Sequence, residues 1–189
     1  IENFYSGVCG EEIFRDIYKK YETRLKENRL IDFDDMLSYT YELFKERPDI
    51  LALWQNKYKY ILIDEFQDIN RLQYEIIKML AAPQNNLFIV GDDDQSIYRF
   101  RGSKPEIMLG FEKDYPNAKR ILLDTNYRCG RYIVEASLNL ISHNRERFDK
   151  KIIAASKSKA PVTFADFENR RDENIFLIRD IDKKIKAGA

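Results

Sequence analysis

Acidic residues follow two apolar runs of this sequence, at the point where each run ends. Residues 60–63 are followed at once by Asp64 and Glu65, and residues 87–90 lead, one glycine later, into the aspartates 92–94. Unbroken apolar runs are typical of parallel strands covered on both faces, and ligands of such sheets bind at the carboxyl ends of the strands. Two neighbouring strand ends rich in carboxylates therefore predict a cation site, for which Mg²⁺ with a phosphate is the usual occupant.

Phosphoryl transfer is the chemistry that these residues suit. In that reaction a strand-end Asp holds Mg²⁺, directly or through water, and a neighbouring acid or amide positions the attacking water. Asp64 suits the first role and Glu65 the second, and the amide of Gln95 follows the second strand, where it can bond phosphate or water. The simpler alternatives are a solvated strand end with helix-capping acids and, for Gln95, an ordinary turn residue.

Aromatic and basic side chains alternate shortly after Gln95. Tyr98 and Phe100 are interleaved with Arg99 and Arg101, and stacking faces between cations form a sequence-tolerant platform for single-stranded nucleic acid. One or both rings could instead belong to the core, and Phe100 suits either place. The basic segment 145–159 could follow a DNA backbone, although a solvated connector is the simpler interpretation.

A parallel α/β sheet is the element that must position these residues. Strands are predicted at residues 60–63, 87–90 and 120–123, parallel and in one sheet, because helical periodicity fills the intervals between them. A further strand is predicted at 162–167. Helices are predicted at residues 11–28, from the N-cap Asp32 through Phe44, through Leu51 and Trp54, and at 70–81, 104–115, 131–144 and 169–186.

Composition narrows the class of protein. The 189 residues are 44% hydrophobic and 34% charged, which suits a globular protein with a buried core. The net charge is zero, so any nucleic-acid site must be a local patch. Cys9 and Cys129 lie too far apart to suggest a disulfide framework or a zinc site, and we expect a reduced, cytoplasmic setting and no membrane segment.

Four segments resemble motifs of the UvrD/Rep/PcrA-like superfamily 1 DNA helicases. Residues 62–68 resemble the Walker B motif (motif II), residues 90–102 resemble motif III, and residues 126–128 resemble motif IV. Residues 32–37 resemble the helix upstream of Walker B, and the order and spacing agree with the family. The resemblance implies a P-loop NTPase (RecA-like) fold: a parallel sheet flanked by helices.

This resemblance also implies a division into two parts. Residues 1–124 would be the C-terminal part of the first RecA-like motor domain, with a helical lead-in over 1–57. Residues 125–189 would begin the second RecA-like motor domain, which is compatible with the single helix, strand and helix predicted there, since so little structure cannot form an independent core.

Roles in ATP hydrolysis follow from the same resemblance. It implies that Asp64 binds Mg²⁺, that Glu65 activates the attacking water, and that Gln95 senses the γ-phosphate. It also implies that Tyr127 stacks near the adenine of ATP and that Arg128 reaches the γ-phosphate.

Roles in DNA binding are implied for the motif III segment. Tyr98 and Phe100 would touch single-stranded DNA, with Arg99 and Arg101 as accompanying cations. The family often has Trp at the position of Phe100 and Ser at the position of Cys129, so the sequence departs from the pattern at both places. Neither departure removes a reacting group.

The implied function is that of an ATP-dependent DNA helicase or translocase on single-stranded DNA, in repair or replication. No Gly-Lys dipeptide occurs in the sequence, so it holds no Walker A loop to cradle the triphosphate. We therefore expect a longer parent protein that supplies this segment and the rest of the second motor domain, and an inactive isolated chain. Two alternatives stay open: a non-catalytic nucleic-acid-binding or interaction module of helicase-like fold, and a metal-dependent phosphohydrolase or nuclease.

Overall fold

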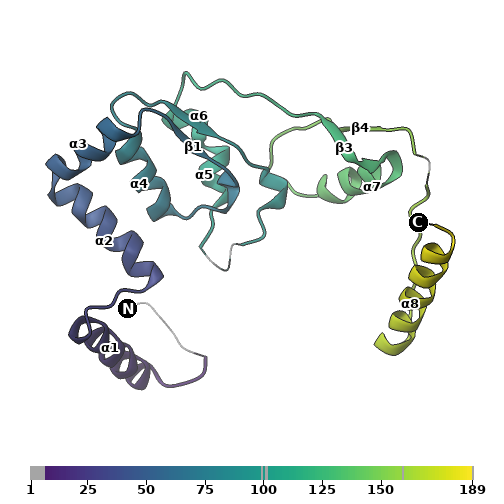
Figure 1. Ribbon diagram of the computed structural model, residues 1–189, viewed down its shortest axis with the longest axis horizontal. Helices are drawn as coiled ribbons and strands as arrows, with labels where there is room; N and C mark the ends of the chain where they lie inside the picture. Colours follow the sequence, from purple (N-terminus) through teal and green to yellow (C-terminus); the bar gives the residue numbers. More distant parts are fainter. Residues whose placement is uncertain (1–6, 99, 101, 159, 189) are drawn as a thin grey trace. The chain divides into compact units, whose positions relative to one another are not determined.

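The computed structural model describes residues 7–98, 100, 102–158 and 160–188, which form two compact units, Ile1–Ala118 and Lys119–Ala189 (Figure 1). The first unit contains α1 (Glu11–Glu27), α2 (Phe33–Glu46), α3 (Pro48–Lys57), β1 (Ile61–Ile63), the 3₁₀ turn η1 (Phe66–Asp68), α4 (Arg71–Ala81), β2 (Leu87–Ile89), the 3₁₀ turn η2 (Asp93–Gln95), α5 (Pro105–Leu109) and α6 (Phe111–Asp114). The second contains β3 (Thr125–Gly130), α7 (Arg131–Ile141), β4 (Ile153–Ser156) and α8 (Arg170–Lys186).

The strands β1 and β2 are parallel, as predicted. Ile61 pairs with Leu87 and Ile63 with Ile89, and the connection between them contains α4, the crossover helix that a parallel pair requires. Because the two strands run in the same direction, both acidic segments lie at the same end of the sheet, where the carboxyl ends of the strands are. The α/β class predicted from the sequence is thus confirmed.

Local capping defines where the helices of the first unit begin. Asp32 caps α2, accepting a hydrogen bond from the backbone N–H of Asp35 at 2.8 Å. Asn70 caps α4 in the same way through the N–H of Gln73, at 2.9 Å. In both helices the side chain of the third helical residue accepts a hydrogen bond from the backbone N–H of the cap residue. These bonds satisfy N–H groups that would otherwise be unpaired. The N-cap predicted at Asp32 and the helix predicted at 70–81 are confirmed.

An aromatic cluster forms the core beneath the first acidic segment. The Phe66 side chain is fully buried and meets the rings of Tyr74 and Phe111 edge to face, at centroid distances of 5.9 and 5.6 Å. Such edge-to-face pairs add stability beyond the burial of their surface. Phe66 directly follows Glu65 in the sequence, so the core anchors the backbone of the candidate site.

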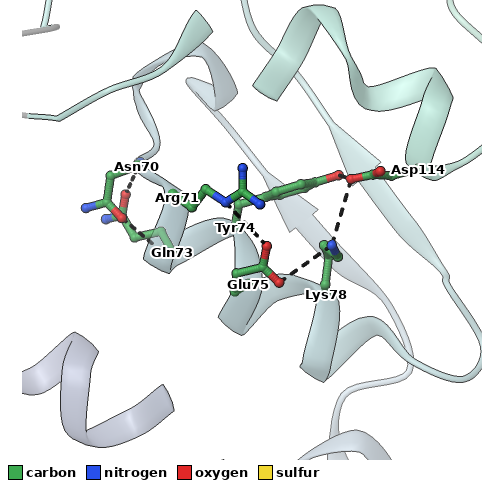
Figure 2. A network of polar contacts seen from close by, with 7 residues as sticks. All are labelled: Asn70, Arg71, Gln73, Tyr74, Glu75, Lys78 and Asp114. Atoms are coloured by element: carbon green, nitrogen blue, oxygen red, sulfur yellow. Dashed lines mark hydrogen bonds and ion pairs between the residues drawn. The ribbon is translucent and has the colours of Figure 1, made fainter. Parts of the chain in front are cut away.

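A polar network joins α4 to α6 on one side of this core (Figure 2). The Tyr74 hydroxyl donates to Asp114 Oδ2 at 2.8 Å, and Lys78 lies 3.9 Å from the same carboxylate and 3.5 Å from Glu75. Burial, together with the Asp114 carboxylate, raises the pKa of Tyr74 well above its ordinary value. The network therefore holds α4 against α6 with a neutral tyrosine as its centre.

The strand predicted at residues 120–123 is wrong. These residues, all described, form no strand, and Ile121 and Leu123 are about 80% exposed. The strand is instead β3, which pairs in parallel with β4 in a second sheet, within the second unit. A strand needs a hydrogen-bonding partner, and β4 lies inside the segment 145–159, which the sequence predicted as a connector.

Other predictions need smaller corrections. Residues 162–167, all described, form no strand, and the helix predicted at 104–115 is divided into α5 and α6 at Gly110. On α2, the first residue, Phe33, is exposed, whereas Phe44 is buried. In the described part of the chain no helix combines the length and apolar character needed to cross a bilayer.

Candidate functional site

The two acidic segments are held side by side by backbone hydrogen bonds that continue beyond the strands. The Val90 N–H donates to the Ile63 carbonyl at 2.8 Å, and the Phe66 N–H donates to the Val90 carbonyl at 2.9 Å. Asp64 and Glu65 therefore leave β1 next to the start of the segment that follows β2. The predicted juxtaposition of the two strand ends is present.

Glu65 has an unusual backbone conformation. Its φ of 49° and ψ of 42° lie in the left-handed region, where a residue with a Cβ is strained. Its N–H donates to Asp64 Oδ1 at 2.9 Å, and the next residue, Phe66, is locked into the core. The turn leaves both carboxylates, those of Asp64 and Glu65, at the surface. Strained residues of this kind cluster at functional sites, which supports a role for this turn.

The side chain of Gln67 links the two segments, although the sequence predicted no role for it. It is 2% exposed. Its Nε2 donates to Glu65 Oε2 at 2.7 Å and to Asp68 Oδ2 at 3.4 Å, and its Oε1 accepts from the Asp92 N–H at 3.0 Å. The sequence did carry a signal for this role, because Gln67 stands between Glu65 and Asp68 directly after a strand. An amide that is buried there must find hydrogen-bond partners.

The segment after β2 is organised around Asp92. Its Oδ2 accepts from the Gln95 amide at 2.8 Å, and its Oδ1 accepts from the Asp94 N–H at 3.2 Å. The Gln95 side chain is exposed apart from this bond. A chain of hydrogen bonds thus runs from Glu65 through Gln67 and Asp92 to Gln95.

The cation site predicted at the two strand ends stays a prediction, and the described residues gather fewer carboxylates there than the sequence suggested. Among the described residues no group of three or more His, Cys, Asp or Glu side chains is placed to hold a metal ion, and the Asp92 oxygens already accept hydrogen bonds. In the exposed carboxylate of Asp64, Oδ1 accepts the Glu65 N–H and Oδ2 is a suitable ligand, because Mg²⁺ is commonly held by one or two carboxylates together with water and phosphate oxygens.

The aromatic pair of the same segment lies at the surface. The rings of Tyr98 and Phe100 have centroids 5.9 Å apart, inclined by 56°, and their side chains are 37% and 79% exposed. The alternative that Phe100 belongs to the core is therefore wrong. Arg99 and Arg101 lie outside the described residues.

Residues 126–128, which resemble motif IV, lie on β3 in the second unit. Asn126 Oδ1 accepts hydrogen bonds from the backbone N–H groups of Arg128 and Cys129, at 2.9 and 2.8 Å. This arrangement leaves the side chains of Tyr127 and Arg128 exposed. Their roles toward a nucleotide stay predictions.

Comparisons with known proteins show which family this chain is similar to. Residues 3–116 match the model of the UvrD/REP helicase N-terminal domain. The chain is 48% identical over 180 residues to YjcD of Bacillus subtilis strain 168, covering 95% of this chain and 24% of that protein. It is 39% identical over 171 residues to the ATP-dependent DNA helicase PcrA of Leuconostoc citreum, covering 90% and 23%. It is 41% identical over 172 residues to PcrA of Staphylococcus aureus strain NCTC 8325, covering 91% and 24%.

The chain therefore spans about a quarter of the length of these relatives. The family model covers more than half of the chain, and it includes both acidic segments and the aromatic pair. This chain belongs to the UvrD/REP helicase family.

Proposed function

We propose that this chain is part of an ATP-dependent DNA helicase that couples ATP hydrolysis to movement on single-stranded DNA. The observation that carries the proposal is the parallel pairing of β1 and β2, which brings the Asp64–Glu65 turn next to the Asp92–Gln95 turn. Both turns lie within the part of this chain that matches the family model. Catalytic and phosphate-sensing groups of a parallel sheet gather at this edge. The relatives named as ATP-dependent DNA helicases support the same assignment.

In this proposal the chain supplies the hydrolytic half of the nucleotide site. Asp64 would hold Mg²⁺, which, when bound, neutralises charge on the phosphate oxygens. The Glu65 carboxylate would orient the attacking water and accept its proton. Gln95, whose exposed amide is tied to Asp92 at 2.8 Å, would exchange that bond for one to the γ-phosphate.

The second unit would contribute to the same reaction as the beginning of a second RecA-like motor domain, from about residue 125, after a first domain that ends near residue 124. Tyr127 would stack near adenine, and Arg128 would stabilise the negative charge that develops on the γ-phosphate. Both side chains are exposed, as a contact with a ligand requires. We also propose that the protein acts in the cytoplasm, where DNA is accessible.

Tyr98 and Phe100 would bind single-stranded DNA by stacking. Their exposed, adjacent rings suit bases of any sequence. They lie within five residues of Gln95, so a phosphate contact at Gln95 could shift the stacking surface. This connection is the proposed link between the nucleotide and the strand.

ATP turnover by the longer protein that contains this chain tests the proposal. We expect single-stranded DNA to stimulate turnover, and Glu65→Gln to lower it by about 100-fold or more, because the base is lost. Glu42→Gln, which changes an exposed glutamate on α2, is the matched control and should leave turnover unchanged. Absence of turnover in the wild type would favour the non-catalytic alternative, and metal-dependent cleavage of DNA would favour a nuclease.

A further inference from the structure

Gln67 occupies the centre of the hydrogen-bond chain between the two turns. Its amide is among the most buried polar groups of the described residues. The amide makes three hydrogen bonds, at 2.7, 3.0 and 3.4 Å. We propose that Gln67 is a positioning residue that orients the Glu65 carboxylate for hydrolysis and ties that orientation to the turn after β2. This inference rests on the proposed function.

The partners of the amide determine its orientation. Glu65 Oε2 can only accept a hydrogen bond when ionised, and the Asp92 N–H can only donate one. Nε2 must therefore face Glu65, and Oε1 must face Asp92. No other neutral side chain of this length offers both a donor and an acceptor in a rigid plane. Replacement by an apolar side chain leaves the Asp92 N–H without its partner and the Glu65 carboxylate without its restraint.

Gly91 shows how closely the two segments approach at this point. A Cβ at Gly91 would lie 2.6 Å from Gln67 Oε1 and 3.1 Å from the backbone nitrogen of Phe66. The first distance is shorter than real Cβ atoms show, and the second is tighter than most real contacts, so a side chain at residue 91 must displace the Gln67 amide and press on the backbone beside it. Gly91→Ala therefore disturbs the same amide without removing it.

Through Asp92, the Gln67 amide is also connected to Gln95. Asp92 donates its N–H to Gln67 and accepts the Gln95 amide on its carboxylate. When Gln95 turns toward a phosphate, the Asp92 carboxylate loses that one partner, and the change at Asp92 is passed through its N–H to the Gln67 amide. The Glu65 carboxylate would follow, since its Oε2 is bonded to that same amide.

A double-mutant cycle in the full-length protein tests the inference. Gln67→Met keeps the volume of the buried side chain but removes its hydrogen bonds, and it should lower kcat for ATP about 10- to 100-fold with KM for ATP nearly unchanged, because a displaced group loses transition-state contacts. In the Glu65→Gln background the same change should lower single-turnover hydrolysis less than about 2-fold, since residues that act as one unit are not additive.

Two further variants keep the test decisive. Gly91→Ala should reproduce the loss of kcat, and it decides the question if Gln67→Met does not fold. Gln55→Met is the matched control, because Gln55 Nε2 donates to the Met79 carbonyl at 2.8 Å between α3 and α4, outside the site. It should lower the melting temperature and leave kcat per folded molecule unchanged. Folded fraction is measured by thermal unfolding and by binding of a non-hydrolysable ATP analogue.

The outcomes separate the two proposals. Equal losses from Gln67→Met in the wild-type and Glu65→Gln backgrounds, or an unchanged kcat in both Gln67→Met and Gly91→Ala, would overturn the positioning role. A wild-type protein without DNA-stimulated turnover, or a fully active Glu65→Gln variant, would instead overturn the proposed function.

Discussion

Glu65 combines a strained backbone with an exposed carboxylate. The left-handed conformation costs a residue with a Cβ about 1–2 kcal/mol, and the surrounding structure holds it through the buried Phe66 ring and the Gln67 amide. A turn chosen for stability alone would place glycine here. Its geometry is therefore better explained by the position that it gives to the carboxylate.

Substitution of Glu65 separates this strain from the chemistry. We expect Glu65→Gly to be more stable than Glu65→Ala by about 1 kcal/mol, because only glycine adopts φ near 49° without strain. Both variants should lack ATP turnover in the full-length protein. Urea unfolding measures the difference in the free energy of unfolding, and equal stability of the two variants would show that the turn relaxes in solution.

Tyr98 is expected to bind DNA by stacking. In the full-length protein Tyr98→Ala should weaken binding of a short single-stranded oligonucleotide by about 1–3 kcal/mol, the usual contribution of one stacked base. Tyr39→Ala on α2, where the tyrosine is similarly exposed, is the control and should bind as wild type. Fluorescence titration measures both affinities, and wild-type affinity in Tyr98→Ala would leave the aromatic pair with a structural role only.

Gln95 is expected to act on coupling rather than on affinity. Gln95→Ala should bind single-stranded DNA normally when no nucleotide is present, because its amide contacts Asp92 and not the aromatic pair. It should reduce the factor by which DNA stimulates ATP turnover. Titrations and turnover assays on the same preparation check both expectations, and normal stimulation would remove Gln95 from the proposed link.

At the scale of elements, α4 connects the sheet to the rest of the first unit. Its cap at Asn70 sets where it begins, Tyr74 enters the aromatic core, and α2 and α3 pack against it. The bond from Tyr74 to Asp114 then fixes α6 to the same helix (Figure 2). A substitution that removes one of these contacts of α4 therefore loosens the support beneath the candidate site.

The Tyr74 hydroxyl predicts a dependence of stability on high pH. Tyr74→Phe should lower the free energy of unfolding by about 1 kcal/mol near neutral pH through the lost hydrogen bond. Because the folded pKa is raised, the folded state keeps its proton where the unfolded state loses it. The stabilisation from this group is thus complete below about pH 10 and is lost as the pH rises further.

Urea unfolding between about pH 8 and 11 checks this prediction. The wild type should lose stability above about pH 10 more steeply than Tyr74→Phe. Some dependence should remain in the variant, because burial also raises the pKa of Tyr115. Parallel curves for the two proteins would contradict the raised pKa of Tyr74.

At the scale of the whole molecule, the two compact units carry different parts of the proposed machinery. The first contains Asp64, Glu65 and Gln95, and the second contains Tyr127 and Arg128. No Gly-Lys dipeptide of a phosphate-cradling loop occurs in either. A chain limited to these 189 residues would therefore hold only part of a nucleotide site.

We predict that the 189-residue chain alone does not hydrolyse ATP. Phosphate release should stay at the background rate with Mg²⁺ and single-stranded DNA present, because the 189 residues contain no Gly-Lys dipeptide of a loop that would cradle the triphosphate. The full-length protein, assayed in parallel, is the positive control. Turnover by the short chain that disappears in Glu65→Gln would show that these residues suffice.

The sequence by itself determined the parts of this protein that depend on neighbours in the chain. The apolar runs of β1 and β2, the acids that follow them, and the cap of α2 at Asp32 were all predictable, because periodicity and capping are local. The parallel pairing also followed from the sequence, since a helix-length connection leaves few other arrangements. The family resemblance added proposed roles for the same residues.

Only the tertiary structure decided the features that depend on distant partners. Residues 120–123 contain the apolar run Ile121–Leu123 and have the composition of a strand, but pairing with β4 selects β3 instead. Nothing local shows that the Gln67 amide will meet the Asp92 N–H, 25 residues away, or that Glu65 will turn left-handed beside a buried Phe66. A buried polar group must find its hydrogen-bond partner wherever the fold supplies one, and that partner exists only after the chain has folded.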